Sequence, residues 1–482
     1  MKQMLIAPFT VRISTTLIAL AISAVLSAGA AAGPKAALPK ELPPYGADKP
    51  LPVPQVEKKT LANGLEVWIV PRNGLPRVDY VLAVRNAGYA ADAIDAPGFA
   101  SLYAGLLSEG TQKHDSRAIA EMAQGFGGSV GANASNDGVT LTADALASNA
   151  ARMLALLAEV ARQPSFPDNE VKLAQANALQ ALKAAEADPS FKATRALLAA
   201  TYGDHPYART QQTEMSIAAV TPAALRAEHA RRFHPDHALL VMTGRIAPAE
   251  GFKLAEQAFG DWKASGAEAL DTPPARKQAP PQLLLIQRDN SVQSTLALGS
   301  PAISATDPDY VPMKLAGTVL GGGFSSRINQ NLREDKGYTY GADAGLQAAR
   351  AGGRVVAGAD VRNEVTGAAL KEFFNEFARL GDEPVPAQEL EDTKRYVAGG
   401  YLISNQLQDA VAATLANNWL IGLPPEFLGQ YVPKIRAVDA AQIQAMAKKY
   451  YDPKQQSIVV VGDGKAVAGQ LKPYGKFEKR DK

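Results

Sequence analysis

Two stretches of the chain, 218 positions apart, carry the same pattern and decide the fold. Residues 221–244 read TPAALRAEHARRFHPDHALLVMTG, and residues 439–462 read DAAQIQAMAKKYYDPKQQSIVVVG. In each stretch a Thr or Asp that can cap a helix opens a helical segment, a proline stops it, and an apolar run follows and ends at glycine. The apolar runs, 238–242 and 458–461, predict buried strands. A shared cap, proline and glycine in a single register indicate an internal duplication.

The segments that precede each copy repeat the same order of elements. Apolar runs predict opening strands at 65–70 and 78–84 in the first half, and at 283–286 and 294–298 in the second half. Helical segments follow in both halves, and each half ends with the repeated unit. The order of elements therefore predicts two homologous domains, each combining strands and helices.

A proline-rich segment separates the two halves. Residues 266–282 contain four prolines and read as a linker. We therefore predict an α+β fold of two α/β sandwich domains, 55–265 and 283–475, each a mixed or antiparallel sheet with helices.

The start of the chain is predicted to be a signal peptide, residues 1–32. Lys2 and Arg12 precede an apolar stretch, 17–26, and small residues that suit cleavage follow. This stretch is shorter than the roughly 20 residues that a membrane span needs, although an N-terminal membrane anchor remains the alternative. We expect an exported, periplasmic protein. Residues 33–54 are rich in proline and are predicted to form an arm on the surface or a tether.

Composition excludes several classes of protein. The chain has no cysteine, which excludes disulfides, a thiol nucleophile and cysteine-ligated metal sites. Lys and Arg number 50 against 48 Asp and Glu, and the predicted signal peptide holds two of those bases and no acid. The remaining chain is formally neutral, so we expect neither nucleic-acid binding nor attraction to anionic membranes. No later stretch reaches transmembrane length, so no membrane span is predicted.

Several short motifs accompany the duplication. They are Leu61-Ala-Asn-Gly-Leu65, a helix at 98–107 that precedes Gly110-Thr111, Gly127-Gly-Ser129, Leu320-Gly-Gly-Gly323 and Leu332-Arg-Glu-Asp-Lys-Gly337. With the duplication, they resemble the insulinase/pitrilysin family of zinc metallopeptidases, in its two-domain, bacterial processing-peptidase-like form. The resemblance covers nearly the whole predicted mature chain. It implies domains that form a clamshell around a peptide.

The resemblance also implies a zinc site whose ligands this chain lacks. In active members the helix at 98–107 carries His-x-x-Glu-His, whose imidazoles bind zinc while the Glu activates water. The two ligand positions fall on Ser101 and Gly105, and the base position falls on Ala104. The third ligand position falls on Ala181, or on Gln180 if the register slips by one residue. We therefore predict no catalytic zinc site and no cofactor on this chain.

The five histidines offer little for an alternative site. His234 and His237, with His229 nearby, fall at a predicted helix-to-strand turn and are interpreted as a surface cluster. His205 is interpreted as structural. A peptidase with relocated metal ligands stays open as a third hypothesis. Counting residues leaves Ser/His/Asp catalysis open too, but no Gly-x-Ser-x-Gly motif is present.

The second half retains a pair of residues that the family uses on substrate. Ser325-Ser326 is expected to cap a helix that runs to about Asp335, and a strand is expected to start at 338–340 with both tyrosines on one face. The resemblance implies that Arg333 binds a substrate carbonyl or carboxylate, and that Tyr340 donates a hydrogen bond to a carbonyl or oxyanion. The alternative is a solvated cation and a packed strand residue. The resemblance also suggests that a peptide pairs with the strand within 127–140.

We therefore predict the non-catalytic, substrate-binding subunit of a heterodimeric periplasmic zinc metalloendopeptidase. Its expected partners are a homologous zinc-binding peptidase subunit, which would supply metal and general base, and a peptide substrate. The alternative is a non-enzymatic peptide-binding or assembly protein with an inherited peptidase fold.

Overall fold

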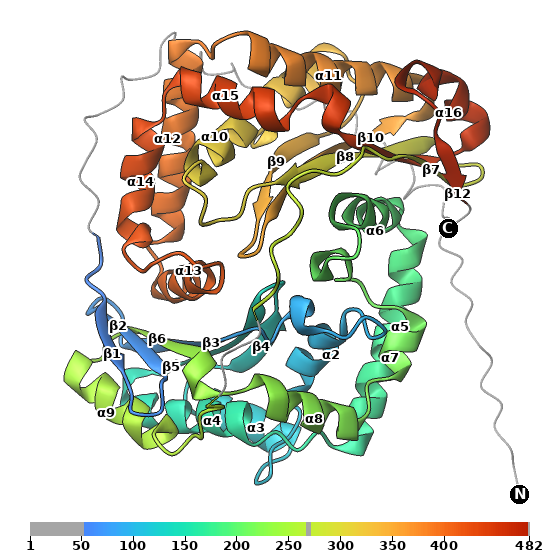
Figure 1. Cartoon of the computed structure of the whole chain (residues 1–482). Helices are drawn as coiled ribbons and strands as arrows, with labels where there is room; N and C mark the ends of the chain where they lie inside the picture. The colour runs from blue at the N-terminus through green and yellow to red at the C-terminus, as the bar shows by residue number, and fades with distance from the viewer. Residues whose placement is uncertain (1–52, 267–270, 481–482) are drawn as a thin grey trace, which may run out of the picture. The chain divides into compact units, whose positions relative to one another are not determined.

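The computed structural model describes residues 53–266 and 271–480. The predicted signal peptide and most of the predicted arm lie outside the described residues. Two six-stranded sheets, each accompanied by helices, make up the described chain (Figure 1). None of the helices in the described ranges is long and apolar enough to cross a membrane.

The first sheet has the strand order β1-β2-β6-β3-β5-β4. Its β2–β6 pair is parallel, and its other pairs are antiparallel. Its strands are β1 (Glu57–Thr60), β2 (Glu66–Pro71), β3 (Arg77–Arg85), β4 (Val130–Ala134), β5 (Gly138–Leu146) and β6 (Ala238–Gly244).

The second sheet repeats this arrangement in the order β12-β7-β11-β8-β10-β9. Strand β7 pairs in parallel with β11 and with β12, and the remaining pairs are antiparallel. The strands are β7 (Leu283–Gln287), β8 (Gln293–Ala302), β9 (Ala342–Ala348), β10 (Gly353–Arg362), β11 (Ser457–Gly462) and β12 (Glu478–Arg480). Because β7, β11, β8, β10 and β9 take the places of β2, β6, β3, β5 and β4, the predicted duplication is confirmed.

Helices follow the strands in the same order in both halves. The first half contains α2 (Phe99–Leu106), α3 (Ser116–Gly125), α4 (Ala150–Arg162), α5 (Asp168–Ala187), α6 (Pro189–Tyr202), α7 (Glu214–Ala218), α8 (Pro222–Arg232) and α9 (Pro248–Phe259). The second half contains α10 (Tyr310–Gly321), α11 (Thr366–Asp382), α12 (Ala387–Ser404), α13 (Gln408–Leu420), α14 (Phe427–Ala437), α15 (Ala440–Tyr450) and α16 (Gly464–Leu471). A π-helical turn, η5 (Asn329–Asp335), precedes β9.

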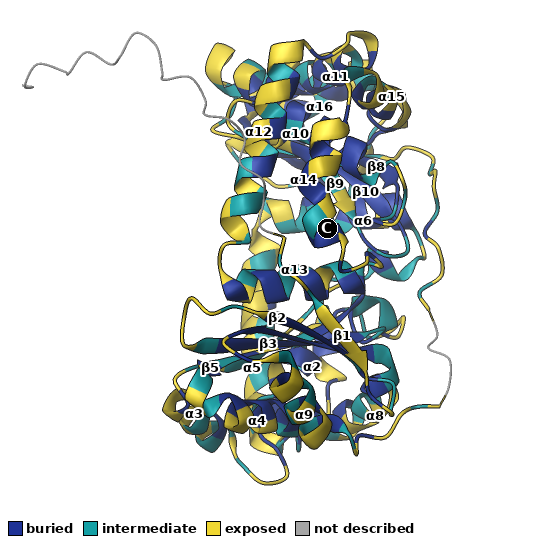
Figure 2. Ribbon diagram, turned by 90° about the vertical axis from the view of Figure 1, so that its left-hand side faces the viewer, coloured by how far each residue is buried: buried dark blue, intermediate teal, exposed yellow. Residues whose placement is uncertain are grey.

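The repeated sequence unit folds as its pattern predicts. The Thr221 hydroxyl accepts a hydrogen bond from the Ala224 amide (3.1 Å), and the Asp439 carboxylate accepts one from the Gln442 amide (2.8 Å), so each residue caps its helix. The strands that follow, β6 and β11, are buried along their whole length. Figure 2 shows the same dark-blue burial along the neighbouring strand β3. Burial on both faces explains why the sequences of β6 and β11 are continuously apolar rather than alternating.

The two halves exchange one helix each. Helix α6, from the first half, packs on β8 and β11, and α13, from the second half, packs on β3 and β6. Ala193 and Leu197 of α6 belong to one apolar cluster with Val459. Leu415 of α13 packs in another with Val81. Each sheet therefore needs a helix from the other half to cover one of its faces.

Polar contacts fix the two ends of α13 on the first sheet. At its start, Gln408 Nε2 donates to the buried Asp79 carboxylate (2.7 Å), and Thr243 Oγ1 donates to the Gln408 carbonyl (2.7 Å). At its end, the Arg85 guanidinium lies 3.6 Å from the centre of the Trp419 ring. These contacts specify the position of the helix in addition to its apolar burial.

Candidate functional site

The helix expected to carry a zinc motif is α2, and it exposes the two ligand positions. Ser101 and Gly105 are exposed and lie one helical turn apart, whereas Ala104 is fully buried. A Cβ atom at Gly105 would meet nothing within 4 Å, so the surface beside this position is open. The backbone of the family motif is therefore present without its side chains.

The residues at these positions do not fit a zinc ion. Ser101 offers a neutral hydroxyl, Gly105 offers no side chain, and Ala181 and Gln180 lie exposed on α5 without a carboxylate or imidazole. Zinc sites in proteins use His, Cys, Asp or Glu side chains. Across the part of the chain that the structure describes, no three such side chains come close enough to hold a metal ion.

Below the exposed face of α2, an aromatic cluster holds a partly buried histidine. The Tyr103 hydroxyl lies 2.8 Å from His229 Nδ1, and the rings of Phe166 and Phe233 pack against both residues. Burial lowers the pKa of His229 to about 4, so the imidazole is neutral at pH 7 and accepts the hydrogen bond from the hydroxyl. His229 is therefore packed among aromatic side chains, and it belongs to no metal-binding group in the described part of the chain.

The partly buried His229 should make stability depend on pH. Its folded pKa of about 4 lies below the ordinary value of 6.5, so the unfolded chain binds the proton first as the pH falls. We expect His229 to reduce the free energy of unfolding by about 1.5 kcal/mol between pH 6.5 and 5. Urea unfolding at both pH values should show this loss in the wild type, and His229→Asn, which can still accept from Tyr103, should lack it. An equal loss in both proteins would contradict the assignment.

A buried ion pair fixes the start of α2. Arg232 Nη1 lies 3.0 Å from Asp92 Oδ1, and both side chains are 1% exposed. The other oxygen of Asp92 accepts from the Ala100 amide in the first turn of α2 (3.1 Å), while Arg232 also donates to the Ala87 carbonyl (3.0 Å). This network attaches α2 to α8, so the helix stays in place although its zinc ligands are absent.

Three of the remaining histidines occupy turns, and the fourth, His114, has Nδ1 2.8 Å from Glu159 Oε1. His234 Nε2 lies 2.9 Å from the Ala230 carbonyl oxygen, and the His234 and His237 ring centres are 6.3 Å apart. Asp236, between them, accepts hydrogen bonds from the backbone and the hydroxyl of Ser265. His205 Nε2 contacts the Pro273 carbonyl oxygen at 2.7 Å, which agrees with the structural role interpreted for it.

In the second half, the segment that carries Arg333 is helical but differs in detail from the prediction. Ser326 Oγ donates to the Gly323 carbonyl (2.6 Å) and does not cap the helix, so the predicted cap is wrong. The helix continues into the π-helical turn η5 and ends before Gly337, whose φ of 61° suits glycine, as predicted. Arg333 lies in the last turn of η5.

The predicted strand at 338–340 is also wrong, because β9 starts only at Ala342. Thr339 Oγ1 donates to the Gly341 carbonyl (2.7 Å) and accepts from the Gly341 amide (3.1 Å), and these local bonds replace pairing with a neighbouring strand. The two tyrosines consequently differ, since Tyr338 packs against the core whereas Tyr340 is 94% exposed.

Arg333 and Tyr340 both keep donors available to a ligand. The Arg333 guanidinium lies 4.8 Å from the centre of the exposed Phe324 ring, and its Nε is 3.5 Å from a Glu334 carboxylate oxygen. No hydrogen bond to the Tyr340 hydroxyl is present among residues 53–266 and 271–480, and no direct contact joins it to Arg333. The sequence reasoning missed Phe324, although an aromatic residue directly after three glycines was a usable signal.

Two buried polar groups hold this segment in place. Asn329 bonds both backbone groups of Ala342, with Nδ2 donating to the carbonyl (2.7 Å) and Oδ1 accepting from the amide (3.0 Å). Arg327 makes a two-bond contact with Glu389 of α12 (2.7 and 2.9 Å). Because η5 is fixed to β9 and to α12, Arg333 starts from a defined backbone position.

The strand suggested for peptide pairing lies at a sheet edge. Within 127–140 the chain forms β4, which pairs only with β5 and ends the first sheet. In the second sheet, β9 has the equivalent edge position. An edge leaves backbone groups free for pairing, so peptide binding at β4 stays a prediction.

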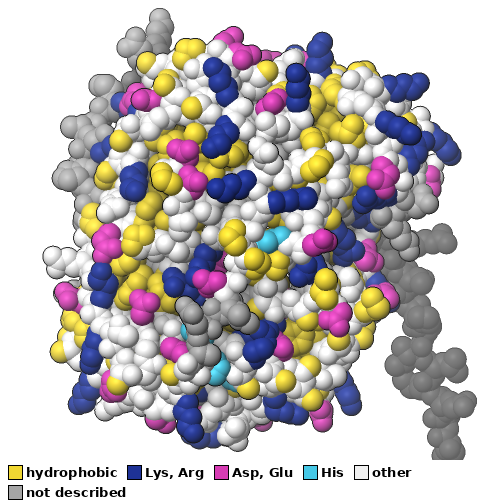
Figure 3. Space-filling model, in the orientation of Figure 1, with side chains coloured by type: hydrophobic (Ala, Val, Ile, Leu, Met, Phe, Trp, Pro, Cys, Tyr) yellow, Lys and Arg dark blue, Asp and Glu magenta, His cyan; other side chains and the backbone are white. Residues whose placement is uncertain are grey.

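The surface has no single dominant sign of charge on the face shown in Figure 3. Lysine and arginine side chains are interspersed there with aspartate and glutamate. This mixture gives no extended basic area on that face for a nucleic-acid backbone.

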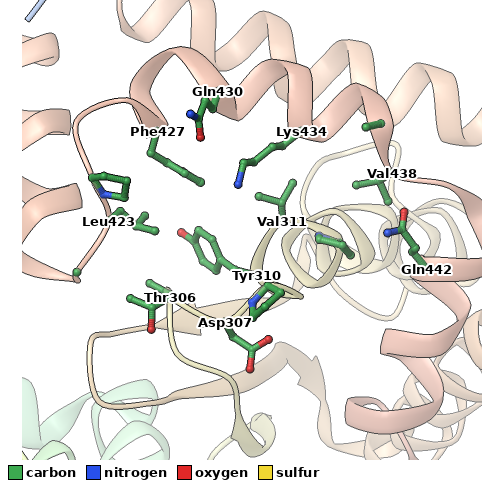
Figure 4. A pocket seen from close by; sticks show the side chains of 16 residues that line it. Thr306, Asp307, Tyr310, Val311, Leu423, Phe427, Gln430, Lys434, Val438 and Gln442 are labelled. Atoms are coloured by element: carbon green, nitrogen blue, oxygen red, sulfur yellow. The ribbon is translucent and has the colours of Figure 1, made fainter.

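A separate cavity of about 400 Å³ lies between α10 and α14 (Figure 4). Tyr310 and Phe427, whose ring centres are 6.1 Å apart, line it together with Val311, Leu423 and Lys434. This lining is largely apolar and lacks a paired acid and base, so the cavity is suited to contact rather than to catalysis.

Comparison with known proteins agrees with these features. The chain matches the family model "Insulinase (Peptidase family M16)" over residues 78–213 and the model "Peptidase M16 inactive domain" over residues 219–397. It is 24% identical over 403 residues to the uncharacterized zinc protease YmxG of Bacillus subtilis, covering 82% of this chain and 96% of that protein. It is 23% identical over 390 residues to the non-peptidase homolog YmxG of Helicobacter pylori, covering 80% of this chain and 88% of that protein.

A solved structure gives the same result. The crystal structure of a peptidase M16 inactive domain from Pseudomonas fluorescens superposes with a TM-score of 0.79 and 27% identity, covering 85% of this chain and 98% of that one. The duplicated sheets, the α2 helix without metal ligands and these matches lead to one conclusion: the chain belongs to the insulinase family, peptidase family M16.

Proposed function

We propose that this chain is the non-catalytic, substrate-binding subunit of a two-chain zinc endopeptidase that acts in the periplasm. A homologous partner with an intact His-x-x-Glu-His motif would supply the zinc ion and the general base. This chain would bind the peptide through Arg333 and Tyr340. The M16 inactive-domain match and the non-peptidase name of the Helicobacter pylori relative support a role without catalysis on this chain.

One observation carries the proposal: the family's substrate-binding pair is exposed although every zinc-ligand position has been lost. Tyr340 is 94% exposed, and the Arg333 side chain is 36% exposed beside an exposed aromatic ring. An exposed aromatic ring beside an arginine, as Phe324 lies beside Arg333, is typical of binding surfaces. The buried contacts of Asn329 and Arg327 hold this surface in place, which favours a binding role over that of an unused remnant.

A mixing experiment tests the proposal. The mature chain and a homologue with the intact motif are purified separately, and cleavage of a mixed pool of quenched fluorescent peptides is measured for each chain and for the mixture. We expect cleavage only in the mixture, with zinc bound to the partner alone. Full activity of the partner by itself would contradict the proposal and favour a non-enzymatic assembly protein. Stoichiometric zinc in this chain would support relocated ligands instead.

A further inference from the structure

A groove on the second sheet leads from the Tyr340 segment to a buried arginine. It has a volume of about 280 Å³ and is lined by β9, β10, part of β8 and the first half of α6. Gly341, which follows Tyr340 directly, and Asp343 line one end of the groove. Gln347 and Arg354, which pair across the β9–β10 ladder, lie at its other end.

Arg354 is buried without an anionic partner. The residue is only 9% exposed. Its Nε and Nη2 both donate to one neutral oxygen, Gln347 Oε1 (3.1 and 2.8 Å). Among the described residues, its Nη1 is buried without a hydrogen-bond partner, and no carboxylate forms an ion pair with the guanidinium. Burial accordingly lowers the pKa of Arg354. A buried cation is costly unless an anion accompanies it.

The groove has the length of a short extended peptide. Ala342, at the start of β9, pairs with Ala359, and Arg354 lies five residues from Ala359 along β10. At about 3.4 Å per residue this separation is roughly 17 Å. A peptide that contacts Tyr340, two residues before Ala342, would therefore reach Arg354 about seven residues further along its chain.

We propose that the groove binds a carboxylate of the substrate peptide, either an acidic side chain or the C-terminal carboxylate, which pairs with Arg354. The inference rests on the proposed function, because it needs a peptide held at Tyr340 and Arg333. A guanidinium offers two parallel N–H donors to a carboxylate, so the pair would satisfy both charge and geometry. Small side-chain adjustments would open the Nη1 edge to the ligand.

The other charges in the groove favour a peptide over a small free anion. Asp343 and Asp360 also line the groove and would repel an incoming anion. Their effect is reduced because the Thr295 hydroxyl donates to Asp360, and burial raises the pKa of Asp343. An inorganic anion has no other contact to offset this repulsion. A peptide carboxylate is attached to a backbone that gains binding energy elsewhere.

Peptide binding measured by fluorescence anisotropy tests the inference. The probes are labelled ten-residue peptides of Gln and Ser with an amidated C-terminus, in which a single Glu occupies each position in turn. An all-Gln peptide and a version with a free C-terminal acid complete the set. For the mature wild-type chain we expect one Glu position, or the free acid, to bind about tenfold more tightly than the all-Gln peptide. The series thereby distinguishes an acidic side chain from a C-terminal carboxylate.

Variants show whether Arg354 is responsible. Arg354→Met should remove the preference for the carboxylate, so that the Glu-containing and all-Gln peptides bind with equal affinity, without lowering the Tm, since it removes an unpaired buried charge. Gln347→Glu should also remove the preference, because it places an internal carboxylate against the guanidinium, and it should raise the Tm. Arg333→Ala should weaken binding of every peptide equally.

The possible outcomes separate the two proposals. A preference that persists in Arg354→Met, or no preference in the wild type, overturns the carboxylate site alone. Failure of every peptide to bind overturns the proposed function and this inference with it.

Discussion

Replacing Arg333 with alanine is expected to lower kcat/KM of the two-chain peptidase by about 10²- to 10³-fold, the range seen when one preorganised donor to a reacting carbonyl is removed. Arg333 is the one cation that the proposed function places directly on the substrate. Its guanidinium is only loosely paired with Glu334, at 3.5 Å, so it can reorient towards a ligand without breaking a strong bond. Steady-state cleavage of a quenched fluorescent peptide by the reconstituted mixture measures the loss.

The matched control is Arg379→Ala. Arg379 is an exposed arginine on α11, in the same half of the chain. Its guanidinium pairs with Glu383, which directly follows the end of that helix (3.2 Å). Its removal should leave kcat/KM unchanged, and both variants should form the complex with wild-type affinity. If Arg333→Ala and Arg379→Ala had equal activity, Arg333 would be a solvated surface cation and the binding role would be lost.

Replacing Arg232 with methionine is expected to reduce the free energy of unfolding by about 3–5 kcal/mol, the cost of leaving one member of a buried ion pair without its partner. Asp92 would remain 6% exposed beside α2, held only by the Ala100 amide. The substitution preserves much of the side-chain volume, so the loss reports on charge and hydrogen bonding rather than on a cavity. Urea unfolding at pH 7, followed by tryptophan fluorescence, measures it.

The adjacent arginine supplies the comparison. Arg231 also pairs with Glu228, but its side chain is 51% exposed. Arg231→Met should therefore change stability by only about 0.5 kcal/mol. Similar losses for the two variants would mean that the Arg232–Asp92 pair contributes no more than an exposed pair. The double variant Asp92→Asn with Arg232→Met should recover part of the stability, because no charge is then left buried alone.

The sequence predicted the parts of the fold that depend on local pattern. Thr221 and Asp439 are caps whose chemistry acts within one helical turn, and the apolar runs that became β6 and β11 need no knowledge of their neighbours. The exchange of α6 and α13 was not predictable in this way. An apolar helix face indicates that a helix is buried, but it does not indicate which of two similar sheets the helix packs against.

In the candidate site, too, local features could be predicted from the sequence and features that depend on distant residues could not. The spacing of Arg333 and Tyr340 was readable from the motif, and their exposure agrees with the role that the resemblance implied. No strand forms at Tyr338 because the Thr339 side chain hydrogen-bonds the backbone locally. The alternation of side chains in the sequence does not reveal this local bonding. Arg354 gave no signal at all, because its burial comes from α6, which lies more than 150 positions earlier in the sequence.

The helix exchange has a consequence for the order in which the two halves can fold. The first sheet ends with β6 at Gly244, but the helix that covers its second face ends only at Leu420. Until that helix is in place, Trp68, Val81 and Val241 would leave apolar surface exposed to water. The two halves therefore complete their structures together rather than one after the other.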